Sequence, residues 1–442
     1  MGHSIGQLGG RRTHGCCWTL DLFLLLTFLA AAAVTHSVAR SPPNYLPKCT
    51  RTLCTGVASV AHPRLQPWTT GPPTTVDVPL HLAWPARRSG LVPLVILLHG
   101  ALVRSSDYAG LVSTLGRQAV VAAPEYSARN FTLPPGVPSA GPIFDTFLDT
   151  IATKGKRPEC PSQGVLPSSR LVQSVLDAFS AAARAAPGTS RPHPALARAV
   201  AAADRRKLVL FGHSAGAAAA LTLATGQCAS SVLSPLQVRI SCEGASTPPA
   251  DLAGVVWYSG TVGPQDTVAK LPPGVWGLGI GGGTPAEKRL LANVTGALAP
   301  APGGNGYGVL LTAVAVGAGH YGVAGVRRTC VPRAPAGQRG PAGGPPLCAA
   351  PNAGDANFTT TPSKAAAVVR LVADTTAAAM DAYLAYPVRP EAGKGARLEA
   401  ARRRSRGCSY LSAMVKGSLP GLERITVKGT PKAAGCRGVV GK

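Results

Sequence analysis

At its centre the sequence reads Lys207-Leu208-Val209-Leu210-Phe211-Gly212-His213-Ser214-Ala215-Gly216. The apolar residues 207–211 predict a buried strand, and the Ala-rich stretch that starts at Ala215 predicts a helix. A G-x-S-x-G pattern at a strand–helix junction is typical of a nucleophile elbow, a sharp turn that exposes a serine above a sheet. Gly212 and Gly216 lack a Cβ and let the helix pass close to its neighbours. We predict that Ser214 is a catalytic nucleophile, with His213 as the variable residue of the elbow.

The same alternation of apolar runs and helical patterns continues on both sides of the elbow. It predicts an α/β fold, with a doubly wound, mostly parallel sheet and helices on both faces. We expect strands at 76–84, 91–98, 119–123, 207–211, 254–257, 274–280 and 309–316, the first of them an edge strand. We expect helices at 107–117, 168–185, from 215 onward and at 363–386.

A serine nucleophile needs a base, and in such folds an acid and then a histidine follow the serine along the chain. His320 follows the last predicted strand, in a loop of small residues, and is the predicted base. The acid is Glu287, after strand 274–280, or Asp266, after strand 254–257, and we favour Glu287. For the oxyanion hole we expect the backbone N–H groups of Ala215 and of Ala101, which lies in the turn after strand 91–98.

These residues resemble the α/β-hydrolase superfamily and, within it, the chlorophyllase family. The resemblance covers residues 91 to 386 and is carried by short motifs along that range. They are Leu97-Leu98-His99-Gly100, Ser105-Ser106-Asp107-Tyr108, Val121-Ala122-Ala123-Pro124, Gly212-His213-Ser214-Ala215-Gly216, the glycine-rich loop that ends at Glu287, and Gly319-His320-Tyr321. After the histidine, the order of a cysteine-bearing loop and a long helix also matches the family. The resemblance implies hydrolysis of the phytyl ester of chlorophyll, a hydrophobic substrate, without a metal or organic cofactor.

The sequence also departs from that family. Chlorophyllases usually carry Arg-Gly-Gly after the elbow serine, where this chain has Ala215-Gly216-Ala217. Their Asp-rich segment, often assigned as the source of the acid, is replaced by residues 258–261, Tyr-Ser-Gly-Thr. Two alternatives therefore stay open: a secreted lipase or cutinase-like esterase with a lipid-like substrate, and a catalytically degenerate hydrolase that acts as a binding protein.

Length and composition agree with one large globular domain. The chain has 442 residues, of which 45% are hydrophobic and 14% charged, which excludes a fully disordered chain, a small disulfide-stabilised fold and a polytopic membrane protein. The 52 Gly and 41 Pro residues indicate long irregular insertions. We expect an irregular segment at 40–75, an α/β-hydrolase domain with Pro/Gly-rich insertions at 76–387, and a basic tail at 388–442.

The formal net charge of +25 is partly concentrated in that tail, which holds 13 of the 44 Lys and Arg residues. We expect that the tail can contact an anionic membrane or surface. No nucleic-acid-binding motif accompanies the charge, so specific nucleic-acid binding is not expected.

Residues 1–39 have the pattern of a secretory signal peptide: two arginines, an apolar run at 22–34, and a small-x-small site. We expect a secretory or extracellular location, with a plastid as the alternative. Three Asn-x-Thr sequons, each in an expected loop, agree with secretion: Asn130, Asn293 and Asn357. Proximity along the chain suggests four disulfides and leaves Cys160 unpaired: Cys49–Cys54, Cys228–Cys242, Cys330–Cys348 and Cys408–Cys436. The cysteines lack the spacing of a zinc site.

Overall fold

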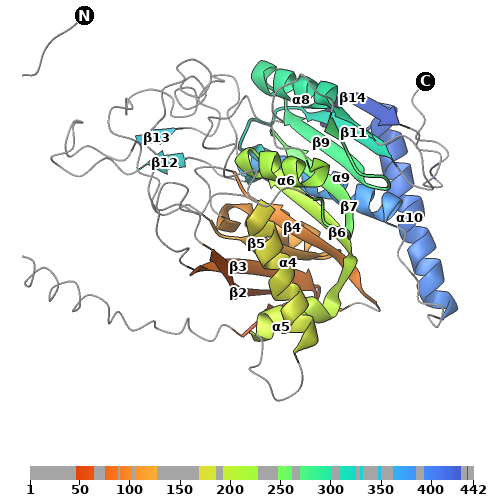
Figure 1. Cartoon of the computed structure of the whole chain (residues 1–442). Helices are drawn as coiled ribbons and strands as arrows, with labels where there is room; N and C mark the ends of the chain where they lie inside the picture. The colour runs from red at the N-terminus through yellow and green to blue at the C-terminus, as the bar shows by residue number, and fades with distance from the viewer. Residues whose placement is uncertain are drawn as a thin grey trace, which may run out of the picture. The chain divides into compact units, whose positions relative to one another are not determined.

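The computed structural model of the chain describes most of the region that follows the expected leader (Figure 1). The described residues are 46–63, 75–87, 90–100, 105–126, 169–185, 193–226, 247–260, 269–300, 308–324, 329–331, 347–349, 362–384, 393–429 and 436. Several sequence predictions lie outside these ranges: the leader 1–39, Ala101, Asn130, Cys160, Cys228, Cys242, Asp266 and Asn357.

Ten strands form the main sheet of the described region, in the order β1-β2-β3-β5-β4-β6-β7-β9-β11-β14. Their bounds are β1 Lys48–Cys49, β2 Leu53–Pro63, β3 Thr75–Pro85, β4 Val92–Leu98, β5 Val120–Pro124, β6 Ala203–His213, β7 Leu252–Tyr258, β9 Trp276–Gly282, β11 Val309–Ala315 and β14 Leu422–Gly429. The six strands from β5 to β11 run parallel, and the outer pairs are antiparallel. The winding reverses between β4 and β6, so a crevice is expected at the carboxyl ends of these strands.

Helices cover both faces of this sheet (Figure 1). Their bounds are η1 Ser105–Tyr108, α2 Ala109–Leu115, α4 Ser169–Arg184, α5 Pro194–Ala202, α6 Ala215–Thr225, α8 Pro285–Ala297, η2 Gly322–Ala324, α9 Pro362–Tyr383 and α10 Lys394–Val415. Two short sheets accompany them, formed by β8 Ala269–Lys270 with β10 Leu298–Ala299 and by β12 Thr329–Val331 with β13 Leu347–Ala349. None of the described helices is long and apolar enough to cross a membrane.

Successive residues of the central strands contribute to two hydrophobic cores. In β4, Val95 and Leu97 pack with α2 and α9, whereas Leu94 and Ile96 pack with α4, α5 and α6. A strand that is buried on both faces reads as a continuous apolar run, because neither set of side chains meets water. The predicted fold class, a mostly parallel α/β sheet with helices on both faces, is confirmed.

The segment expected to be irregular, residues 40–75, contains a long strand instead. β2 pairs with β3 along its whole length, from Leu53 opposite Pro85 to Pro63 opposite Thr75. β3 is therefore an interior strand and not the predicted edge strand. β2 has only three large aliphatic side chains, and small residues such as Gly56 and Ala58 fill the rest, so its alternation is weak.

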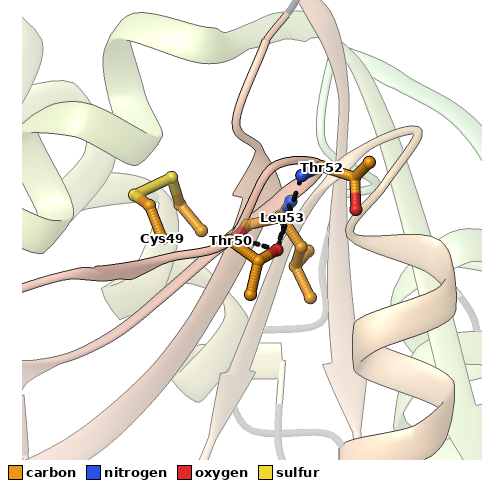
Figure 2. Close-up of a disulfide and its surroundings, with 5 residues drawn as sticks. Cys49, Thr50, Thr52 and Leu53 are labelled. Carbon is orange, nitrogen blue, oxygen red and sulfur yellow. Dashed lines mark hydrogen bonds between the residues drawn. A yellow bond between two sulfur atoms is a disulfide. The ribbon is translucent and has the colours of Figure 1, made fainter.

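A disulfide joins Cys49 to Cys54 where β1 turns into β2, as the sequence predicted (Figure 2). Within the turn, the Thr50 hydroxyl accepts hydrogen bonds from the backbone N–H groups of Thr52 and Leu53, at 3.4 and 3.1 Å. The predicted Cys408–Cys436 disulfide is also formed. The backbones of Cys330 and Cys348 lie directly opposite each other in β12 and β13.

The sequon at Asn293 does not lie in a loop, as we expected, but in α8. The Asn293 side chain is exposed, while the hydroxyl of Thr295 is buried and donates to the backbone oxygen of Leu291 at 2.6 Å. The helix starts at a proline and has few large apolar residues, so its periodicity is weak in the sequence.

Residues 388–442, expected as a basic tail, contain the helix α10 and the strand β14. β14 pairs antiparallel with β11 and extends the sheet. α10 packs on α9 through Leu411 and Met414, and a Cβ at Gly407 would lie 2.6 Å from the backbone oxygen of Ala378. The many arginines of α10 mask this narrow apolar face in the sequence. Contact of these arginines with an anionic surface stays a prediction.

Candidate active site

Ser214 occupies a strained turn between β6 and α6. Its φ and ψ are 53° and −117°, a region in which a residue other than glycine costs about 1–3 kcal/mol and persists only when its surroundings hold it there. Its N–H donates to the backbone oxygen of Tyr258 on β7 at 3.0 Å, and its own backbone oxygen accepts from Ala217 at 3.0 Å. The turn therefore has the geometry of a nucleophile elbow.

The two glycines of the elbow permit its close packing. A Cβ at Gly216 would lie 2.2 Å from the backbone oxygen of Leu98, and one at Gly212 would lie 2.4 Å from the Cα of Ala217. Both distances are far below van der Waals contact, so only glycine fits. The absence of these two side chains brings α6 against the ends of β4 and β6, as the motif predicts.

The turn that follows β4 lies directly beside the serine. A Cβ at Gly100 would approach the Cβ of Ser214 to 3.2 Å. Ala215 is the first residue of α6, so its N–H has no acceptor within the helix and is suited to bind an oxyanion. The other N–H that we predict for the oxyanion hole, that of Ala101, lies just beyond Gly100 and outside the described residues.

Beyond β11, His320 meets Glu287. The Nδ1–H of His320 donates to Oε1 of Glu287 at 2.7 Å, and the two residues are only 9% and 4% exposed. Glu287 lies in the first turn of α8, directly after β9, and Thr284 caps this helix by accepting the N–H of Glu287 at 3.1 Å. The structure thus brings together the predicted base and the favoured acid. The alternative acid, Asp266, lies outside the described residues.

Several groups determine the charge of this pair. Burial raises the pKa of Glu287, but the charge and hydrogen bond of His320, with contacts from Ser259 and the Gly282 backbone, lower it more strongly, so the pKa is lowered overall. An ionised carboxylate can fix the tautomer of His320 and stabilise its imidazolium form. Because Nδ1 of His320 donates to Glu287, Nε2 is the nitrogen of this ring that can act as a base.

His213, expected only as the variable residue of the elbow, holds the loop of His320 and the turn after β4 together with Tyr258 and Tyr108, for which no role was expected. Nε2 of His213 donates to the backbone oxygen of His320 at 2.8 Å, and the hydroxyl of Tyr258 donates to that of Gly319 at 2.8 Å. The hydroxyl of Tyr108 contacts Nδ1 of His213 and accepts from the N–H of Gly100 at 3.0 Å. Tyr108 is the last residue of the Ser-Ser-Asp-Tyr motif, one of those that resemble chlorophyllases. That motif is the feature of the sequence from which a role for Tyr108 could have been inferred.

His99, by contrast, has a structural role. Its Nδ1–H donates to the backbone oxygen of Gly100 at 2.9 Å, and its Nε2 accepts from the N–H of Tyr126 at 3.3 Å. Glu125 holds the other end of the same turn, because its carboxylate accepts both the N–H and the hydroxyl of Ser105, at 3.0 and 2.5 Å. Across the described ranges, no group of three or more His, Cys, Asp and Glu residues could hold a metal ion.

Comparisons with known proteins find matches among solved structures but not among sequences. No family model matches the sequence, and no curated protein sequence matches it. A ferulic acid esterase from Streptomyces cinnamoneus is 17% identical, with 79% of this chain and 96% of that chain covered and a TM-score of 0.40. A protein described as a dienelactone hydrolase from Klebsiella pneumoniae is 15% identical, with coverage of 62% and 89% and a TM-score of 0.31.

The sheet order and the strand-end positions of Ser214, Glu287 and His320 define the class of the protein: the chain has the α/β-hydrolase fold. The serine follows the third strand of the parallel set along the chain, and the acid and the histidine follow the fifth and sixth.

Proposed function

We propose that the chain is a serine carboxylic-ester hydrolase. The observation that carries this proposal is the 2.7 Å hydrogen bond between His320, in the loop after β11, and Glu287, in the first turn of α8 after the adjacent strand β9. The same sheet presents Ser214. A buried, ionised carboxylate on Nδ1 of a histidine has a direct use in general-base catalysis.

The proposed mechanism uses all three side chains. Oγ of Ser214 attacks the ester carbonyl while Nε2 of His320 takes its proton. The N–H of Ala215 and an N–H of the turn after Gly100 stabilise the oxyanion. The tetrahedral intermediate collapses, the C–O bond breaks, and His320 returns the proton to the leaving alcohol. Water, deprotonated by His320, then attacks the acyl carbonyl, the bond from the carbonyl carbon to Oγ of Ser214 breaks, and His320 returns the proton to Oγ as the acid leaves.

For the substrate, we propose the phytyl ester of chlorophyll, which would yield chlorophyllide and phytol. The motifs around Gly100, Ser214 and His320 support this choice, because they are the ones that resemble chlorophyllases. A lipid-like ester is the second candidate, favoured by the expected leader peptide. A hydrolase without activity is the third, but the intact His320–Glu287 pair argues against it.

A replacement of Ser214 by Ala tests the proposal. We expect a loss of several orders of magnitude in the turnover of a short p-nitrophenyl ester, because the nucleophile is lost, with little change in thermal unfolding. A fluorophosphonate should label Ser214 in the wild-type protein. Hydrolysis of a phytyl ester compared with a triglyceride then distinguishes the first two substrates. Full activity of Ser214→Ala would overturn the assignment.

A further inference from the structure

We propose that His213 is a positioning residue that, together with Tyr108, links the three parts of the catalytic site: the oxyanion turn, the nucleophile and the base. The proposal rests on the proposed function. It gives a role to the elbow residue that the G-x-S-x-G motif leaves variable.

The hydrogen-bond directions around His213 follow from its partners. The backbone oxygen of His320 can only accept, so Nε2 of His213 carries a proton and donates to it at 2.8 Å. In the neutral ring Nδ1 is then an acceptor, and the Tyr108 hydroxyl donates to it. The same hydroxyl oxygen accepts the N–H of Gly100 at 3.0 Å. One directed chain therefore runs from the oxyanion turn to the loop of the base.

This chain joins the ends of three strands. Gly100 follows β4, His213 ends β6, and His320 follows β11. The His213 ring also packs under the turn, since a Cβ at Gly100 would lie 2.7 Å from Nδ1 of His213. Any shift of the ring would move both the turn that faces the oxyanion and the backbone of His320. Small displacements of this kind are costly, because a misplacement of about 1 Å can reduce a rate about a hundredfold.

His213 is suited to this role because it stays neutral. It is fully buried, and burial, followed by the nearby charge of His320, lowers its pKa well below the usual value. The groups that face its ring are His320, His99, Tyr108, Tyr258 and Tyr321. The ring centroids of His213 and His320 are 5.1 Å apart. A charged His213 would therefore oppose the imidazolium that His320 must form during each turnover.

If His213 only filled space in the core, its variants would behave differently. In that case its size would matter and its nitrogens would not, and the hydroxyl of Tyr108 would be dispensable. The variants should therefore keep the volume and remove the hydrogen bonds. His213→Leu removes both nitrogens, His213→Gln keeps an N–H within reach of the His320 oxygen, and Tyr108→Phe removes only the hydroxyl.

Three quantities are then measured for each variant: the turnover of a p-nitrophenyl ester, the pH profile of kcat/KM, and the rate of Ser214 phosphonylation. We expect His213→Leu to lower kcat about a hundredfold, with KM changed less than about threefold. His213→Gln should restore kcat to within about tenfold of the wild type. Tyr108→Phe should lower kcat about tenfold, and the double variant Tyr108→Phe/His213→Leu should be no worse than His213→Leu, because both act through one chain.

Tyr383→Phe is the matched control. Tyr383 is also a buried tyrosine, but within the described residues its hydroxyl has no hydrogen-bond partner, so its loss should leave kcat unchanged. Equal activity of His213→Gln and His213→Leu, or a Tyr108→Phe variant as active as Tyr383→Phe, would overturn the proposal. If His213→Leu does not fold, Tyr108→Phe and His213→Gln still decide the question. Failure of the proposed function would appear separately, as wild-type protein that does not react at Ser214.

Discussion

Ser259 occupies the strand end at which the chlorophyllase resemblance predicts an acid. It follows β7, has a φ of 50°, and its N–H donates to the backbone oxygen of Ile280 on β9 at 3.1 Å. Its contact with Glu287 lowers the pKa of that carboxyl group, after the larger effects of burial, which raises it, and of His320, which lowers it. The carboxylate that contacts His320 thus follows the next strand of the sheet, β9, whereas a serine follows β7.

We therefore predict that Glu287→Gln lowers kcat by about two to four orders of magnitude, because an amide can favour the wrong tautomer of His320. The matched control is Asp266→Asn, which should change kcat less than tenfold. Both variants are compared on one soluble ester, after circular dichroism has shown that they are folded. If Asp266→Asn were the inactive variant, the acid would lie after β7.

At the scale of elements, β14 contacts both β11, which precedes His320, and α8, which contains Glu287. It pairs with β11, which leads to His320, and Glu423 forms an ion pair with Lys288, next to Glu287, at 2.7 Å. At the far end of α8, the Lys428 ammonium donates to the backbone oxygen of Thr295 and, at 3.3 Å, to that of Leu298. A cation at a helix C-terminus is stabilising, because it meets unpaired carbonyls and the negative end of the helix dipole.

We predict that Lys428→Met lowers the free energy of unfolding by about 1–2 kcal/mol, since these partly buried carbonyls lose their donor. Urea unfolding followed by fluorescence measures the change. Lys394→Met, at the exposed start of α10, is the control and should be neutral within about 0.5 kcal/mol. Equal effects of the two substitutions would show that the contact with α8 does not stabilise the fold.

The sequence predicts a strand or turn most reliably where nearly every residue is apolar or where only glycine fits. The runs at Leu94–Leu98 and Leu208–Phe211 are buried on both faces, and the glycines of the elbow fit only one geometry, so β4, β6 and the position of Ser214 followed directly. α10 and β2 were missed because their buried faces are narrow or built from small residues. The chain through Tyr108 and His213 joins residues 105 positions apart, and no local pattern records such a contact.

At the scale of the whole molecule, buried histidines set the response to acid. Burial, followed by the charge of Arg170, lowers the pKa of His62 to about 4, and burial also lowers the pKa values of His99 and His213. Each group is neutral in the folded protein at a pH at which the unfolded chain binds a proton. Their contribution to stability is therefore complete above about pH 6.5 and is lost as the pH falls toward 4.

We predict that the free energy of unfolding decreases steadily as the pH falls from about 6.5 to 4. His62→Gln should reduce this slope, since an uncharged amide can replace the 2.9 Å hydrogen bond to Ser174 without a titration. Urea unfolding across this range at constant ionic strength measures it. A stability that rises on acidification would contradict the assignment of these histidines as neutral.

The position of β14 in the chain has a consequence for biosynthesis. A ribosome makes β14 roughly a hundred residues after His320, so this strand is synthesised after Ser214, Glu287 and His320. Until then the chain can form the elbow, but β11 lacks its partner strand β14. The proposed esterase activity would thus develop only at the end of synthesis, when β14 pairs with β11 and the Cys408–Cys436 disulfide forms.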